Sequence, residues 1–247
     1  MKRFALVGAV LLLVYSLVAA AFTKKTVSLA SLEWPPYIGQ ALPNKGYVAQ
    51  IAVEAFARAG YEVNIVFLPW NRAVKETLQG KHDAYFPEYA SDEVAQQFLF
   101  SYPFPGGPLG FFKRKGAPIV FRSLEDLKLY RIGVVRGYVN APEFDAADYL
   151  TKDMAPDDLS NLKKLIGKHI DLAVADKFVG FYLLKNQWPE QKDAVEFVEP
   201  PLESKDLFVC FPKSTPGSQE LHKAFNLGLQ RLKQDGHLDA LIAQRGF

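Results

Sequence analysis

The residue types that most often carry catalysis occur in this chain of 247 residues, but they are not arranged for it. The four histidines have neither metal-ligand spacing nor companion cysteines, so surface positions are expected for them. No Gly-rich phosphate loop and no Gly-x-Ser-x-Gly nucleophile elbow occurs. The single cysteine, Cys210, lies in an apolar run where a buried and inert thiol is expected. The sequence therefore predicts no catalytic residue, no metal site and no cofactor.

Aromatic and charged side chains gather instead where strands are expected to end. In open α/β sheets, ligands bind at the carboxyl ends of the strands. Aromatic rings there offer stacking surfaces, and charged groups offer paired hydrogen bonds. Any one of these rings could belong to the core, but five such strand ends together favour a shared pocket for a small polar molecule. The candidate ligand-binding residues are Glu33, Trp34, Tyr37, Trp70, Arg72, Glu88, Tyr89, Arg136, Tyr138 and Asp176.

Alternating strands and helices must position these residues. In the first half of the chain, strands are expected at residues 26–32, 63–68 and 83–86, with helices at 44–60 and 69–80. The segment 102–108 is rich in proline and glycine, so a loop or crossing is expected there, followed by a strand at 109–113. The pattern then restarts, with strands at 130–135, 170–175 and 195–198 and helices at 142–150, 159–166 and 176–185. This alternation predicts α/β units with largely parallel sheets.

The last part of the chain determines the expected topology. A strand at 207–211 and helices at 216–233 and 235–244 are too little for a third domain, so they should pack on an existing lobe. The chain would then cross between two lobes twice and leave a cleft and a hinge. We expect lobe one to comprise residues 24–112 and 207–247, and lobe two residues 113–206.

The N-terminus has the layout of a secretory signal peptide. Lys2 and Arg3 precede an apolar stretch that ends in the small residues Ala19, Ala20 and Ala21. A membrane anchor is the alternative, but the apolar run is shorter than the roughly 20 residues that a span requires. Residues 1–21 are expected to be cleaved, and the absence of a cysteine at the cleavage point argues against a lipoprotein.

The charge balance excludes several partners. Without Lys2 and Arg3, the 29 basic residues become 27, which equals the number of acidic residues. A neutral protein has no electrostatic footprint for nucleic acid or an anionic membrane. We therefore expect no nucleic-acid partner, no stable membrane insertion and a monomer that binds a small molecule.

Several motifs in a fixed order resemble the bacterial extracellular solute-binding proteins of family 3. They are Trp34-Pro35-Pro36-Tyr37, Leu68-Pro69-Trp70-Asn71-Arg72-Ala73, Gly80-x-x-Asp83-Ala84, Phe98-x-Phe100-Ser101-x-Pro103-Phe104, Leu124-Glu125-Asp126-Leu127 with Arg131 to Gly137, and Asp171 to Asp176. That family includes the lysine/arginine/ornithine- and glutamine-binding proteins of amino-acid ABC importers. The resemblance covers the chain after the signal peptide. It implies an α/β, two-lobed periplasmic binding protein fold (type II) with two hinge crossings and a ligand cleft between the lobes.

The resemblance also implies roles for single residues. The position of Asp176 holds the ligand's α-amino group, and an aromatic ring near Trp34 or Tyr37 stacks on its side chain. The turn at Gly137-Tyr138 is expected to offer backbone N–H groups at a helix start. The family's carboxylate-binding arginine corresponds to Val94, so the ligand carboxylate is expected to be secondary, absent, or held by Arg72 or Arg136.

The expected function is therefore capture of a small polar, amine-containing solute in the periplasm for an ABC-transporter permease, without chemistry. Two alternatives remain. A dehydratase of the cyclohexadienyl or arogenate type uses the same fold and would require a positioned acid such as Glu88 or Glu33. A ligand-sensing module would use the same clamp to signal through a separate chain.

Overall fold

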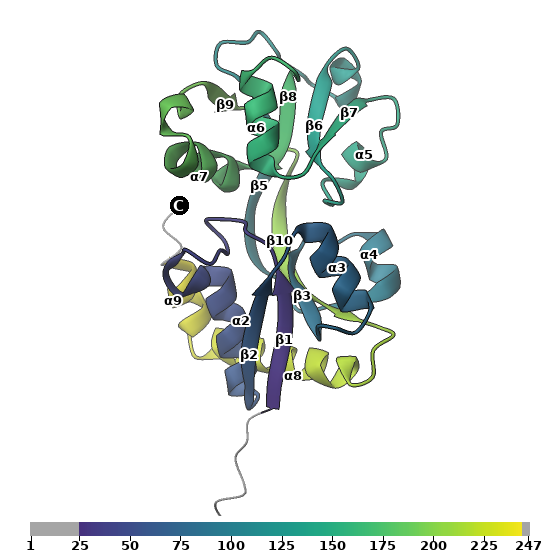
Figure 1. Cartoon of the computed structure of the whole chain (residues 1–247), viewed down its shortest axis with the longest axis vertical. Coiled ribbons are helices and arrows are strands. Elements are labelled where there is room, and N and C mark those ends of the chain that lie inside the picture. Colours follow the sequence, from purple (N-terminus) through teal and green to yellow (C-terminus); the bar gives the residue numbers. More distant parts are fainter. Residues whose placement is uncertain (1–24, 244–247) are drawn as a thin grey trace, which may run out of the picture.

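The computed structural model describes residues 25–243 as two α/β lobes joined by two long strands (Figure 1). The expected signal peptide lies outside the described residues. Among those described, no helix is both long and apolar enough to cross a bilayer.

The first lobe is built on three parallel strands, with β1 between β2 and β3. The antiparallel β10 extends this sheet, and the short β4 pairs with β10. Helices flank the sheet and bury their apolar faces on it. The elements are β1 (Lys25–Ser31), η1 (Pro43–Lys45), α2 (Tyr47–Arg58), β2 (Tyr61–Phe67), α3 (Trp70–Leu78), β3 (Ala84–Glu88), α4 (Asp92–Gln97) and β4 (Phe98–Phe100).

The second lobe repeats this plan, with β6 in parallel between β7 and β8. Every residue of β8 is buried, as expected for a parallel strand that is covered on both faces. The elements are η2 (Leu124–Leu127), β6 (Arg131–Val135), α5 (Pro142–Asp145), β7 (Thr151–Ala155), α6 (Asp158–Ile166), β8 (Leu172–Asp176), α7 (Lys177–Gln187), η3 (Pro189–Gln191) and β9 (Val195–Phe197).

Two antiparallel strands, β5 (Phe104–Arg114) and β10 (Glu203–Pro212), run through both lobes. The C-terminal half of β5 pairs with β8, and the C-terminal half of β10 pairs with β3. The expected lobe boundaries at 112/113 and 206/207 fall inside these strands. The segment 102–108, expected to be a loop or crossing, contains the start of a crossing strand, because β5 begins at Phe104. Its prolines are accommodated opposite a register shift in β10, between Ser204 and Asp206.

The C-terminal helices α8 (Ser218–Gln234) and α9 (His237–Ala243) pack back on the first lobe, against α2. Gly228 permits this close approach, since a Cβ there would lie 1.8 Å from the carbonyl oxygen of Ala55.

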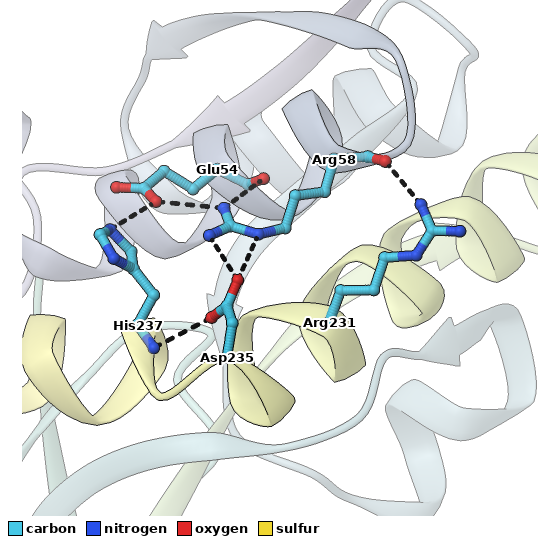
Figure 2. A network of polar contacts seen from close by, with 5 residues as sticks. All are labelled: Glu54, Arg58, Arg231, Asp235 and His237. Atoms are coloured by element: carbon cyan, nitrogen blue, oxygen red, sulfur yellow. Dashed lines mark hydrogen bonds and ion pairs between the residues drawn. The ribbon is translucent and has the colours of Figure 1, made fainter.

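A polar network ties the C-terminal helices to α2 (Figure 2). The Arg58 guanidinium lies 3.2 Å from Glu54 Oε2 and 3.0 Å from Asp235 Oδ2. Arg231 Nη1 donates to the Arg58 carbonyl, and His237 Nε2 lies 2.9 Å from Glu54 Oε2. The last helices are thereby held by charged contacts at their surface and by apolar packing beneath it.

Candidate functional site

The two lobes touch directly through hydrogen bonds between their facing loops and helix ends. Tyr37 Oη of the first lobe donates to Asp176 Oδ2 of the second at 2.9 Å. Trp70 Nε1 donates to the carbonyl oxygen of Gly137 at 2.9 Å. Gly137 has φ +79°, and a Cβ on it would lie 2.1 Å from Asn71 Oδ1. The structure is therefore a closed arrangement, and a residue other than glycine at 137 would be strained in it.

Three aromatic rings line the first-lobe side of this contact. The chain turns sharply after β1, with Trp34 and Ile38 bridged across the turn. Trp34 stacks on Tyr37 with 4.5 Å between ring centroids and 19° between planes. The Tyr89 ring meets Trp34 edge-on at 5.9 Å. This packing fixes all three rings before any ligand enters.

Asp176 ends β8 and caps α7. Its Oδ1 accepts hydrogen bonds from the backbone N–H groups of Phe178 and Val179 at 2.8 and 3.1 Å. The side chain is almost fully buried, with the residue 2% exposed. Burial raises the pKa of Asp176 to about 7, although the hydrogen bond from Tyr37 partly offsets this. The helix fixes Oδ1, so Oδ2 is the oxygen that faces the other lobe.

A second buried aspartate, Asp158, lies beside it at the first position of α6. The residue is 4% exposed. Burial raises its pKa to about 7, the charge of Asp176 adds to this, and the Trp34 indole partly offsets it. Trp34 Nε1 is itself buried and makes no hydrogen bond to any residue in the described range. Two carboxyls and an unsatisfied N–H thus share one buried region between the lobes.

Glu88, at the end of β3, is the third buried acid. Its oxygens accept from Tyr85 Oη at 3.0 Å and from the backbone N–H of Tyr89 at 2.8 Å. Burial raises the pKa of Glu88 to about 8. The hydrogen bonds from Tyr89 and Tyr85 and the charge of Lys205 partly offset this rise in pKa. The Lys205 ammonium lies 2.9 Å from Glu203 Oε2 and over the Tyr89 ring.

Two cavities lie between the lobes. The smaller one has a volume of ≈ 30 Å³, enough for a water-sized molecule. The other lies toward α6 and α7 and has a volume of ≈ 260 Å³. The first is lined by Leu32, Trp34, Trp70, Pro87, Glu88, Tyr89, Tyr138, Val139 and Leu207. The second is lined by Glu33, Trp34, Pro35, Tyr138, Asp157, Asp158, Leu159, Val179, Leu183 and Gln187.

The structure brings together eight of the ten residues selected from the sequence. They line a cavity or make the contact between the lobes, and they are Glu33, Trp34, Tyr37, Trp70, Glu88, Tyr89, Tyr138 and Asp176. Glu33 is exposed at the rim and accepts hydrogen bonds from Gln40. Arg72 and Arg136 are exposed and line neither cavity, and Arg72 borders a separate surface hollow along α3.

The N–H groups expected at Gly137-Tyr138 do not form a cradle at a helix start. The N–H of Tyr138 donates to the carbonyl oxygen of Val135, and α5 begins only at Pro142. This turn therefore contributes the Gly137 carbonyl, as the acceptor for Trp70, and the Tyr138 ring, which meets Trp70 edge-on.

Sequence reasoning missed Asp158, Lys205 and Gly107. Lys205 alternates with the buried positions of β10, a signal for an inward-facing lysine. A Cβ on Gly107 would lie 2.1 Å from Tyr37 Oη and 2.6 Å from Asp176 Oδ2, so the bare backbone of β5 passes beside this contact. Asp158 follows the capping Asp157, and an acid at a helix start gives no sequence signal for burial. Within residues 25–243, no group of three or more His, Cys, Asp or Glu side chains could hold a metal ion.

Solved structures with the same fold are numerous. A histidine kinase sensor domain with similarity to periplasmic binding proteins matches with a TM-score of 0.80 at 20% identity, over 90% of this chain and 97% of its own. An ancestral arginine-binding protein bound to arginine matches with a TM-score of 0.74 at 21% identity, over 90% and 98%. The GluR0 ligand-binding core from Nostoc punctiforme in complex with L-glutamate matches with a TM-score of 0.73 at 22% identity, over 89% and 99%. These similarities establish the two-lobed fold, and no curated protein sequence matches the chain.

The family assignment comes from the sequence itself. The profile of the bacterial extracellular solute-binding proteins, family 3, matches residues 30–245, which include both lobes and both crossing strands. The motifs singled out from the sequence lie within this match. The chain therefore belongs to the bacterial extracellular solute-binding proteins of family 3.

Proposed function

We propose that the protein captures a small solute with an amino or guanidinium group between its lobes and carries out no chemistry on it. One observation carries this proposal. Among the described residues, the buried charged side chains are three acids, Glu88, Asp158 and Asp176, and one base, Lys205. Lys205 already pairs with Glu203. Because buried carboxylates without partners are costly, a cationic solute is the complement that this cleft favours.

Asp176 is proposed as the main anchor for the cationic group. It occupies the family's amine-binding position, and Oδ2 is directed at the first lobe, where Tyr37 now donates to it. The solute's ammonium would replace the Tyr37 hydroxyl as the partner of Oδ2. Trp34, Tyr37 and Tyr89 would then pack on the apolar part of the solute.

The position of Val94 supports a secondary role for any solute carboxylate. Val94 lies in the first turn of α4, where its N–H donates to the Ser91 hydroxyl and its side chain packs on the core. No guanidinium can be supplied from this position. Arg72 and Arg136, the replacements considered from the sequence, are exposed outside the cavities.

Capture is proposed to occur by closure about β5 and β10. The smaller cavity, of ≈ 30 Å³, is too small for an amino acid, so the lobes would have to separate for a solute to reach this part of the cleft. Lobe one would comprise residues 24–112 and 207–247, and lobe two residues 113–206. Tighter binding to the closed form than to the open form drives closure.

The setting proposed for this activity is the periplasm, after cleavage of residues 1–21, with the closed monomer delivering its solute to an ABC-transporter permease. N-terminal sequencing of the periplasmic fraction should begin between Ala20 and Lys24. Recovery of the uncleaved leader on membrane-bound protein would contradict this location.

A sensing role is the second candidate, and the sensor-domain neighbour with a TM-score of 0.80 favours it. Its signalling partner would be a separate chain. Deleting the gene for the cognate permease separates the two roles, because transport of the solute would stop while a sensing response would persist.

The solute can be identified by native mass spectrometry of protein purified without refolding, since a carried-over molecule is identified by its mass. A thermal-shift panel of basic amino acids, amines, small peptides, dicarboxylates and sugars then ranks the classes. Stabilisation by amines and not by dicarboxylates or sugars is expected, and the reverse result would refute the proposal. Turnover of prephenate or arogenate would instead identify an enzyme.

A further inference from the structure

We propose that Asp158, together with the Trp34 indole, forms a second cation subsite, and that the solute carries two cationic nitrogens, one for each buried aspartate of the second lobe. This inference rests on the proposed function, because it assumes that Asp176 takes the first nitrogen. The family resemblance assigns no role to Asp158.

The larger of the two cavities between the lobes has the charge that such a subsite requires. Its lining contains the carboxylates of Glu33, Asp157 and Asp158 and no basic side chain. Asp157 is committed to capping α6, where its Oδ1 accepts from the N–H of Ser160, and Glu33 accepts from Gln40. Asp158 is the only one of the three that is buried. It is therefore the carboxylate for which a partner inside the cavity matters most.

The Trp34 indole supplies a buried hydrogen-bond donor beside Asp158. Trp34 is 6% exposed, and its Nε1 makes no hydrogen bond within residues 25–243, whereas a buried Trp N–H usually finds an acceptor. The Trp34 side chain lowers the pKa of Asp158 as a hydrogen-bond donor does, so the Asp158 carboxyl lies close enough to become the acceptor of this N–H. Together these groups can hold an ionised Asp158 between the indole N–H and a solute cation.

The rest of the cavity fits an aliphatic spacer. Its apolar lining consists of Pro35, Leu159, Val179, Leu183 and the Trp34 ring. The N–H of Val179 also donates to Asp176 Oδ1, so this apolar wall extends from the Asp158 side of the cavity toward Asp176. A volume of ≈ 260 Å³ accommodates a short methylene chain with a terminal ammonium or guanidinium group.

The test compares 1,5-diaminopentane with pentylamine, which differ by one ammonium group. Calorimetric titration of the wild-type protein should give at least tenfold tighter binding of the diamine. Asp158→Asn, which preserves shape, should weaken diamine binding by about 10–100-fold, the usual range for a lost charge-assisted hydrogen bond. Its effect on pentylamine should be far smaller, whereas Asp176→Asn should weaken both. The exposed Asp193→Asn is the matched control and should change neither.

The outcomes distinguish the two proposals. If pentylamine binds and the second ammonium adds nothing, or if Asp158→Asn weakens both amines equally, the second subsite is refuted and the Asp176 anchor stands. If neither amine binds the wild-type protein, the amine-binding function is refuted and the subsite with it. Retained pentylamine binding by Asp158→Asn also shows that the variant is folded.

Discussion

Replacing Asp176 with asparagine removes a negative charge from the cleft while keeping the shape of the side chain. The new side chain keeps an oxygen for the N–H groups of Phe178 and Val179, and asparagine caps helices about as well as aspartate. Burial raises the pKa of Asp176 to about 7, so asparagine also resembles the protonated form of this carboxyl. The unliganded melting temperature should therefore change by only a few degrees.

Solute binding should respond much more strongly. An ammonium left without its buried partner costs roughly 3–5 kcal/mol, which corresponds to at least a hundredfold loss of affinity. A solute at about 100 times its Kd stabilises the wild-type protein by about 2.7 kcal/mol, but the same concentration would then only equal Kd and add about 0.4 kcal/mol. For a chain of this size these values correspond to shifts of roughly 5–11 °C and 1–2 °C.

Differential scanning fluorimetry with the amine that stabilises the wild-type protein most measures both quantities. Asp193→Asn, on an exposed turn, is the control for the loss of a carboxylate elsewhere. A full ligand-induced shift in Asp176→Asn would refute the assignment of this residue as the anchor. A collapse of the unliganded melting temperature would refute the argument that the carboxylate is dispensable for the fold.

Three further predictions follow from the geometry. Burial raises the pKa of Asp176 to about 7, so below that pH a solute ammonium can bind only if the carboxyl first loses its proton. Calorimetry should therefore show the affinity for the amine falling about tenfold per pH unit below 7 and levelling off above it. Gly228→Ala should lower the free energy of unfolding by about 2 kcal/mol, measured by denaturant titration, because the methyl would overlap the carbonyl of Ala55. Gly137→Ala should hinder closure, because its methyl would meet Asn71, and scattering should give a larger radius of gyration than for the wild-type protein at saturating solute.

The Gly137 prediction has a matched variant, and the pH prediction has a clear opposite outcome. Gly116 has φ +73° and open space around it, so Gly116→Ala reports the backbone cost of a positive φ without a clash. Equal effects of Gly116→Ala and Gly137→Ala on solute binding would contradict a specific role in closure. An affinity that stays constant from pH 5 to 8 would show that the anchoring carboxyl is already ionised in the unliganded protein.

The fold was predictable because the helical spacing, the apolar runs and the order of the motifs all indicated the same architecture. Helical spacing identified α2, although it begins at Tyr47, after Asn44 has adopted a left-handed conformation in η1. Apolar runs identified β6 and β8, and the motif order identified the family, which the profile match confirms. β7 was missed, since Thr151–Ala155 is a partly exposed edge strand with little apolar character.

The site was harder to predict because it depends on contacts across the lobes. The strand ends indicated eight residues that the structure brings together. Within one helix turn, however, the sequence does not show which side chain faces inward. Trp70 turns inward at the start of α3, whereas Arg72, two positions later, turns outward. Asp158 was missed because a helix-start aspartate is ordinarily solvated, whereas this one is 4% exposed.

The packing of α8 against α2 has a consequence for the order of folding. The second lobe is formed by one continuous stretch of chain between β5 and β10, so its contacts are local in sequence and can form early. The first lobe pairs β3 with β10 and α2 with α8, segments separated by the whole second lobe. Its core cannot close until the last helices have been synthesised. The Arg58–Asp235 ion pair then joins α2 to the end of α8 in the first lobe, whose strands are synthesised first but whose fold is completed last.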